Sequence, residues 1–258
     1  MRAHLMDSLV WTYPDSVIGL KPVRRLALDV ARGGTGAAVI LLNGLVPDAP
    51  VRLTARQSGP GRPARFFRLL DVPVEANTGP VGFAERGQDK NPFVTRRAPF
   101  RVYDAMQPVA GDAFRPAAPT QAVRVHIPVP EDARPGRISC RLTVRQGRES
   151  LDLDLGLQVF RARIPPVGRD SWPYTNWFSL ENMAKRHRLA PWSAAHWAMI
   201  ARYARLMARN RQNTFLLPFK DIFSAGPAGL ALDRGRLRRL VGLFTRAGLY
   251  YIEGGHFG

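Results

Sequence analysis

The sequence predicts a multidomain β plus α/β chain, in which an antiparallel β-sandwich over residues 1–165 is followed by βαβαβ units over residues 166–258. Three observations favour this fold class. Apolar and polar residues alternate with a period of two before residue 160, as they do in half-buried strands. Two prolines, Pro165 and Pro166, end that pattern. Strand-like and helix-like segments alternate after them, which is typical of parallel βαβ units.

The clearest strand covers residues 151–159, where Leu and Val alternate with Asp, Gly and Gln. This spacing puts the apolar side chains on one face of a sheet. Residues 138–144 alternate in the same way, and residues 146–148 between the two segments fit the loop of an antiparallel hairpin. Five further short segments, separated by Gly, Pro and Asp, have the spacing of sandwich strands: residues 24–30, 37–42, 50–56, 65–72 and 122–128.

Cys140 is the only cysteine and falls on the apolar side of the 138–144 strand. We therefore expect a small core residue rather than a nucleophile. A single cysteine excludes an internal disulfide framework and leaves the redox compartment open. No segment approaches the ~20 apolar residues of a membrane-spanning helix, and residues 1–15 contain no apolar run of the secretory type. The compartment therefore stays undetermined.

Two other stretches of the first part have a predicted role. Residues 73–120 contain seven prolines and are expected to form a long irregular segment, which in a compact domain is usually functional or packed on a second domain. The glycines at 33, 34 and 36 are similar to a dinucleotide-binding loop. Val39 stands where the last glycine would be, and the following residues are strand-like, so we expect a turn.

The second part begins with a predicted short strand over residues 174–178. Ser193 is expected to cap a helix that runs to about residue 210, because apolar residues recur there every three or four positions. Residues 213–219 are predicted to form a buried strand. Asp233 is expected to cap a second helix that ends at Gly248, and residues 250–254 a third strand.

The charge of the chain is strongly positive, with 38 Lys and Arg against 20 Asp and Glu and a net charge of +18. Only four of the basic residues are lysines, so arginine dominates. The excess is spread along the chain rather than gathered in one run. We therefore expect solvated arginines on outer helix faces, and binding of nucleic acid stays a third hypothesis because no recognition motif accompanies them.

Candidate site residues lie at the predicted carboxyl ends of the strands, where parallel α/β folds bind ligands. Asn176 and Trp177 end the first strand, and Glu253 and His256 flank two glycines at the end of the third. An indole face can stack on a sugar ring, and a carboxylate and an imidazole can bind its hydroxyl groups. The alternatives are that the tryptophan packs a helix onto a strand and that Glu253 pairs with an arginine. No catalytic residue, metal ligand or cofactor is assigned.

Five segments, in this order, resemble glycoside hydrolase family 123 and its relatives: NPFVTRRAPFRVYDAMQP (91–108), LQVFRARIPP (157–166), NWF (176–178), RQNTFLLP (211–218) and YYIEGGHFG (250–258). The resemblance implies an N-terminal β-sandwich followed by a (β/α)8 barrel, the TIM barrel, that carries the site. Residues 166–258 would then be the first three strands and two helices of an incomplete barrel.

The resemblance also implies a reaction, the retaining, substrate-assisted hydrolysis of β-linked N-acetylhexosaminides. In the family an Asp-Glu pair on a later barrel strand carries it, and no adjacent Asp-Glu pair follows residue 165 here. We therefore expect a fragment that is inactive alone. Asn176, Trp177, Glu253 and His256 would contact the glycan substrate, with no cofactor, nucleic acid or membrane as partner.

A second class of function stays open beside this one. The sandwich can be a non-catalytic module that binds a glycan or a protein partner, in which case residues 1–165 would bind it alone. A nucleic-acid binder would instead lose affinity steeply as salt rises. The sequence predicts neither the linkage of the glycan nor the oligomeric state.

Overall fold

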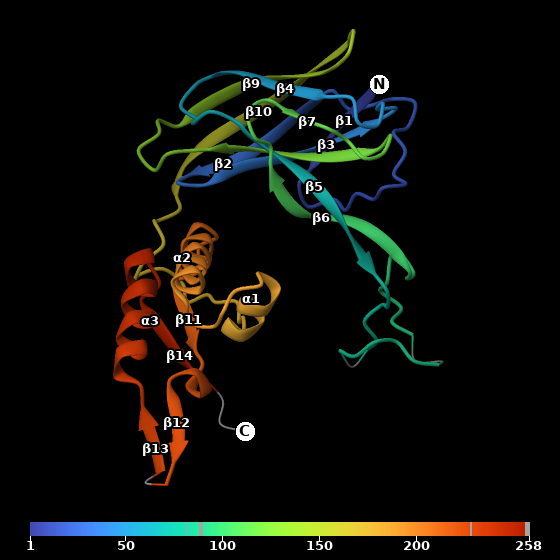
Figure 1. Cartoon of the computed structure of the whole chain (residues 1–258). Helices are drawn as coiled ribbons and strands as arrows, with labels where there is room; N and C mark the ends of the chain where they lie inside the picture. Colours follow the sequence, from blue (N-terminus) through green and yellow to red (C-terminus); the bar gives the residue numbers. More distant parts are fainter. Residues whose placement is uncertain (81, 88–89, 228, 256–258) are drawn as a thin grey trace. The chain divides into compact units, whose positions relative to one another are not determined.

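The structure is a computed structural model that describes residues 1–80, 82–87, 90–227 and 229–255. The chain divides into two compact units, Met1–Ile164 and Pro165–Gly258. The first unit is a β-sandwich of two five-stranded sheets (Figure 1). One sheet has the order β1 (Arg2–Asp7), β3 (Thr35–Asn43), β8 (Gln121–Pro128), β5 (Arg65–Val74) and β6 (Phe100–Pro108). The other has the order β2 (Arg25–Arg32), β10 (Glu149–Arg163), β9 (Gly136–Gln146), β4 (Val51–Ser58) and β7 (Ala113–Phe114).

The period-two pattern produces the sandwich core, as the sequence predicts. Leu153, Leu155 and Leu157 of β10 are each 1% exposed, whereas Asp152 and Asp154 of the same strand face outward. Cys140 of β9 lies in the same core, and burial raises the pKa of its thiol to about 11. The predicted β9–β10 hairpin is confirmed, but its loop is residues 147–148, because Gln146 ends β9 and pairs with Glu149. Burial of these apolar side chains from both sheets is the main stabilising contribution to this unit.

The sandwich is not wholly antiparallel, in contrast to the prediction. β2 pairs with β10 in parallel, from Arg25 beside Asp154 to Val30 beside Val159. The reason is that β2 turns at residues 33–34 into β3, a strand of the opposite sheet. No hairpin therefore fixes the direction of β2 relative to β10.

The prediction of one irregular segment over residues 73–120 is wrong, because β6 and β7 lie within it. A register shift between Leu70 and Asp71 of β5 interrupts the β5–β6 ladder. The shift leaves Asp104 of β6 without a register partner, and two consecutive β6 residues before it, Val102 and Tyr103, are both buried. The bulge and the burial of these two neighbouring residues together remove the alternation that would have revealed the strand.

The glycines at 33–36 form a turn, as expected, and not a nucleotide loop. Gly33 has a φ of 75°, a left-handed conformation that glycine adopts without strain. Gly36 serves a different purpose, since a Cβ built on it would lie 2.1 Å from Cδ2 of Leu157 in the opposite sheet. The absence of a side chain at Gly36 therefore lets Leu157 fill the space between the sheets.

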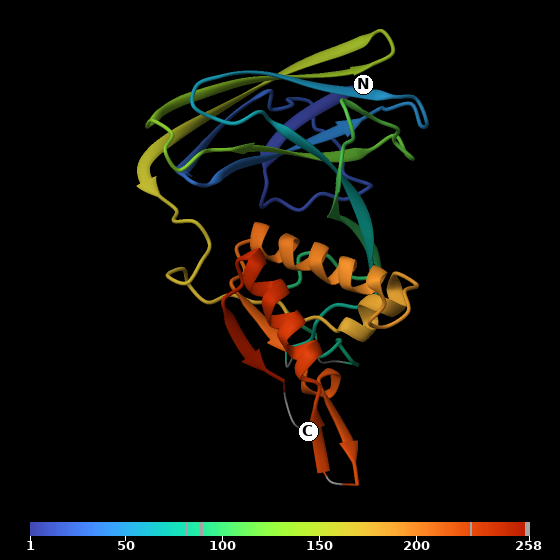
Figure 2. The ribbon, with the colours of Figure 1, turned by 60° about the vertical axis from the view of Figure 1, so that its left-hand side comes forward.

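In its described residues the second unit contains three helices and two pairs of strands (Figure 2). The helices are α1 (Leu180–Arg186), α2 (Ala194–Arg209) and α3 (Arg234–Ala247), with a short 3-10 turn η1 (Phe219–Asp221). The strands β11 (Thr214–Leu217) and β14 (Tyr251–Gly254) pair in parallel, and β12 (Phe223–Gly226) and β13 (Gly229–Leu232) form a hairpin. None of the described helices is both long and apolar enough to cross a membrane.

Both predicted helix caps are confirmed. The Ser193 hydroxyl accepts from the backbone N–H of His196 at 3.2 Å, and the Asp233 carboxylate accepts from that of Arg236 at 2.8 Å. Gly248 ends α3 with a φ of 105°. These contacts satisfy backbone groups that a helix end otherwise leaves unpaired.

The prediction of three strands and two helices for residues 166–258 needs three corrections. The β12–β13 hairpin was not predicted, because its strands show no alternation of buried and exposed residues. Residues 174–178 form no strand, because side-chain amides bond their backbone where a ladder would need backbone partners. The helix α1 was not predicted, since its seven residues are too few to show a helical period.

Removing the space at Gly36 tests the packing between the two sheets. We expect Gly36→Ala to lower the free energy of unfolding by about 1–3 kcal/mol, because its methyl group displaces Leu157. Gly156→Ala is the matched control, since a Cβ there meets nothing within 4 Å. Calorimetric unfolding of both variants measures the difference, and equal stability of the two would contradict this account of Gly36.

Candidate functional site

Two of the predicted site residues, Trp177 and Glu253, meet although 76 residues separate them in the sequence. The indole Nε1–H of Trp177 donates to Oε2 of Glu253 at 2.8 Å. The Trp177 side chain is 58% exposed, and Glu253 is partly buried. Glu253 forms no ion pair with an arginine anywhere in the described ranges. The carboxylate therefore has one oxygen fixed by the indole.

The strand register places this contact on one face of the β11–β14 pair. Phe215 of β11 is buried and stacks on Phe244 of α3, with ring centroids 4.3 Å apart. Leu216, the next residue of β11, points to the opposite face because side chains alternate along a strand. Glu253 is the register neighbour of Leu216 in β14. The Trp177–Glu253 contact thus lies on the face of the strands turned away from α3.

Two polar residues before β11 hold the segment that carries Trp177. Asn213 is completely buried, and its Nδ2 donates to the backbone oxygens of Gly168 and Ser171, each at 3.0 Å. Its Oδ1 accepts from the backbone N–H of Tyr174 at 2.9 Å. The Gln212 Oε1 accepts from that of Asn176 at 3.1 Å. These side chains fix the backbone on the N-terminal side of Trp177.

Asn176 lies next to Trp177 but has a different environment. Its exposed side chain donates to the hydroxyl of Tyr174 at 3.2 Å, and its backbone is held by Gln212. No hydrogen bond joins the Asn176 side chain to Glu253 within the described part of the chain. The predicted residue His256 lies outside the described residues.

Glycine permits a close approach of backbone at the end of β14. The backbone N–H of Gly255 donates to the carbonyl of Leu217 at 3.0 Å. A Cβ on Gly255 would lie 3.1 Å from both that carbonyl oxygen and the backbone nitrogen of Phe219. The small residues after Glu253 therefore extend the pairing of β14 with β11 beyond the strand ends.

Sequence reasoning did not identify the supporting residues Gln212 and Asn213. Both are at least 95% buried. The signal available for them was a polar pair directly before the buried apolar run of β11. Buried polar side chains are normally hydrogen-bonded, so such a pair indicates a local structural role.

Asp221 is a further titratable group that sequence reasoning missed. It ends η1, directly after β11. Burial raises the pKa of its carboxyl, although Lys220 and Arg236 act in the opposite direction. Its Oδ2 is buried without a hydrogen-bond partner among the described residues. Desolvation therefore disfavours the charged form of Asp221.

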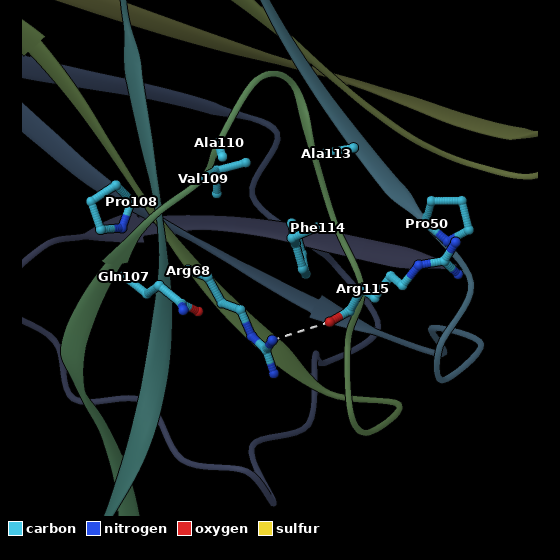
Figure 3. Close-up of a pocket in the computed structure, with 9 residues that line it drawn as sticks. All are labelled: Pro50, Arg68, Gln107, Pro108, Val109, Ala110, Ala113, Phe114 and Arg115. Atoms are coloured by element: carbon cyan, nitrogen blue, oxygen red, sulfur yellow. Dashed lines mark hydrogen bonds between the residues drawn. The ribbon is translucent and has the colours of Figure 1, made fainter.

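A concavity of about 550 Å³ lies in the sandwich unit (Figure 3). Its nine lining residues include Arg68 and Arg115, and Arg68 donates to the Arg115 carbonyl at 3.1 Å. None of the nine is acidic. The concavity consequently lacks the carboxylic acid on which glycoside hydrolysis depends.

A metal site is not apparent in the residues that the structure describes. No group of three or more His, Cys, Asp and Glu side chains gathers in those ranges. The Trp177–Glu253 contact itself offers an aromatic face beside a hydrogen-bonding carboxylate.

The sequence matches no protein-family model and no curated protein. The fold is similar to that of a family 123 glycoside hydrolase from Clostridium perfringens, described in connection with glycolipid glycan hydrolysis, with a TM-score of 0.70 and 10% identity. The similarity covers 96% of this chain and 45% of that enzyme's chain. This chain therefore spans less than half the length of the hydrolase. At this identity the match shows a shared fold.

Two further solved structures match with low TM-scores. The N-terminal domain of PorA covers 62% of this chain and 99% of its own, at 6% identity and a TM-score of 0.31. The CooA pilin subunit of enterotoxigenic Escherichia coli covers 63% of this chain and 99% of its own, at 10% identity and a TM-score of 0.28.

Replacement of Asp221 has an expected pH dependence. A carboxyl whose pKa is raised by folding binds its proton more tightly in the folded state, so its ionisation costs stability above that pKa. We expect Asp221→Asn to raise the thermal midpoint of helix loss at pH 7, with a gain that shrinks as the pH falls and the wild-type carboxyl protonates. Circular dichroism at several pH values follows this transition, because the α-helices all lie in the second unit among the described residues. A gain of the same size at every pH would contradict the assignment.

Proposed function

We propose that residues 1–258 form the N-terminal portion of a glycoside hydrolase that acts on β-linked N-acetylhexosaminides. The observation that carries the proposal is the fold similarity to a family 123 glycoside hydrolase over 96% of this chain. The contact of Trp177 with Glu253 supports it, because it joins an exposed aromatic side chain to a carboxylate. That combination suits a sugar ring, which has apolar faces and a rim of hydroxyl groups.

In this proposal residues 166–258 are the start of a (β/α)8 barrel. The parallel pairing of β11 with β14 supports this, since α3 lies between them in the sequence. The carbonyl of Tyr174 accepts from the backbone N–H of Asn213 at 3.1 Å, so the segment before Trp177 runs beside the start of β11. The proposal assigns this segment, which forms no strand, to the position of the first barrel strand. Ligands of such barrels bind at the carboxyl ends of the strands, where Glu253 lies.

The proposed reaction is retaining hydrolysis with participation of the substrate. The oxygen of the 2-acetamido group bonds to the anomeric carbon while the glycosidic carbon–oxygen bond breaks. A carboxylic acid gives its proton to the leaving oxygen, and water then opens the cyclic intermediate with retention. Trp177 would stack on the sugar, Glu253 would accept from a hydroxyl group, and Asn176 and His256 would contact the same glycan.

Glu253 has a binding role in this proposal and is not the proton donor. Its Oε2 already accepts from the Trp177 indole, so the carboxylate is positioned to orient a ligand. The catalytic Asp-Glu pair of the family has no counterpart after residue 165 in this sequence. Residues 1–258 are therefore proposed to bind the sugar without hydrolysing it.

The proposed partner is a glycan, with no nucleic acid, membrane or cofactor. The contacts of two α3 arginines support the view that the positive charge of the chain serves surface packing rather than nucleic-acid binding. The guanidinium of Arg239 lies over the Trp197 ring at 4.2 Å, and that of Arg236 over Trp192 at 4.3 Å. These contacts occupy the aromatic faces on which the bases of a single strand would stack.

Binding of methyl β-N-acetylgalactosaminide to residues 1–258 tests the proposal. We expect Trp177→Ala to weaken binding about tenfold, a loss of about 1.4 kcal/mol, and Glu253→Gln to weaken it less because the amide keeps an acceptor. Trp172→Ala is the matched control, since Trp172 is 87% exposed. Isothermal titration calorimetry measures the affinities. Unchanged affinity in the Trp177 and Glu253 variants would contradict the proposed site.

The same preparation is expected to release no chromophore from a chromogenic β-N-acetylgalactosaminide. Turnover that co-purifies with the chain and disappears in Glu253→Gln would overturn the binding role given to Glu253.

A further inference from the structure

A cleft of about 330 Å³ lies in the sandwich unit, apart from the concavity around Arg68. Its walls come from three segments of the sequence, within residues 11–13, 74–78 and 91–102. Four of its lining side chains are aromatic: Trp11, Tyr13, Phe93 and Phe100. The volume is at the lower end of the ~300–1,000 Å³ range of small-molecule sites.

Two of these aromatic side chains are displayed to solvent. Trp11 is 62% exposed and Phe93 is 88% exposed. Their apolar surface contributes little to the stability of the sandwich, because most of it stays in contact with water. Exposed apolar surface that is gathered in one cleft, rather than scattered, indicates a binding site.

The other two aromatic side chains form a rigid wall around Arg96. The Arg96 guanidinium lies over the Tyr13 ring at 4.3 Å and over the Phe100 ring at 5.2 Å. Asp15 accepts from both terminal nitrogens of Arg96, at 3.0 and 2.5 Å. This bidentate contact neutralises the charge and fixes the planar group between the rings.

Two asparagines hold the rest of the cleft in shape. Asn77 donates to the carbonyl of Arg96 at 3.1 Å and accepts from the backbone N–H of Ala98 at 2.8 Å. Asn91 donates to the carbonyl of Thr78 at 3.1 Å and accepts from the N–H of Phe93 at 3.0 Å. These bonds order the walls without a ligand, which lowers the entropic cost of binding one.

We infer that this cleft binds uncharged sugar rings of a glycan chain, as a site separate from the Trp177–Glu253 contact. Arg96 is the only charged residue of the lining, and Asp15 balances it, so the cleft favours a neutral ligand. The Trp11 and Phe93 side chains offer apolar surface to the face of a pyranose. The hydroxyl groups of Thr78 and Thr95 in the lining can bond to its rim. The choice of an N-acetylhexosamine sugar rests on the proposed function.

A proline-rich peptide is the other ligand that aromatic grooves of this kind accept. Such grooves bind an extended polyproline helix, which spans several residues along the surface. The cleft of about 330 Å³ suits one or two compact rings better than an extended segment. The two ligands are therefore distinguished by experiment.

Saturation-transfer difference NMR with a trisaccharide of β-linked N-acetylglucosamine tests the inference. We expect the double variant Trp11→Ala, Phe93→Ala to weaken binding at least tenfold in a Trp177→Ala background, where only this cleft remains. The control is Trp172→Ala, Phe83→Ala in the same background, which removes two exposed aromatic side chains elsewhere. Unchanged circular dichroism of both double variants shows that they fold.

Equal binding by the two double variants, or absence of trisaccharide binding in the Trp177→Ala background, would overturn the inference. Preferential binding of a decapeptide of proline would overturn it as well. Failure of the proposed function gives a different result, namely that Trp177→Ala leaves the affinity for methyl β-N-acetylgalactosaminide unchanged.

Discussion

The carboxamide of Asn213 is the group on which the candidate site depends. It is completely buried, and its two ends bond the backbone of Gly168, Ser171 and Tyr174. A buried amide without partners would cost about 1–3 kcal/mol, so these bonds and the conformation of residues 168–174 require each other. The neighbouring Gln212 extends the same arrangement to Asn176. Trp177 follows directly, and its position against Glu253 is a consequence.

This arrangement explains why a segment without regular secondary structure can carry a site residue. Residues 171–178 form neither strand nor helix. Their backbone is instead held by side-chain amides of the two residues before β11. The strand β11 is in turn fixed by the stacking of Phe215 on Phe244. Packing of β11 against α3 therefore determines where Asn213 lies, and Asn213 determines where Trp177 lies. The position of the exposed site residue Trp177 therefore depends on packing in the core of the second unit.

The sequence was sufficient for those parts of the fold that depend on local spacing. The alternation of β9 and β10, the caps at Ser193 and Asp233, and the turn at Gly33 all follow from neighbouring residues. It was insufficient where distant contacts decide. The bulge at Asp104 and the burial of both Val102 and Tyr103 hide the period of β6. The parallel neighbour of β10 is β2, which lies far from it in the sequence.

In the candidate site, too, features set by local spacing could be predicted and features set by distant contacts could not. The position of Glu253 at a strand end could be predicted from the order of elements, whereas Trp177 lies in a segment that forms no strand. The structure joins the two side chains by a hydrogen bond. The roles of Gln212 and Asn213 could not, because they depend on which backbone groups those amides meet. The cleft around Arg96 was equally hidden, since its walls come from separate segments that the sequence pattern does not connect.

The claim that Trp177 and Glu253 together bind a sugar is tested most directly by the indole resonance of Trp177. In ¹⁵N-edited NMR spectra of the chain, assigned with Trp177→Phe, the account predicts that Glu253→Gln shifts this resonance, since its N–H donates to the Glu253 carboxylate. It also predicts a saturable shift on addition of methyl β-N-acetylgalactosaminide. A Trp177 indole resonance whose chemical shift is unchanged by both the substitution and the sugar would contradict the account.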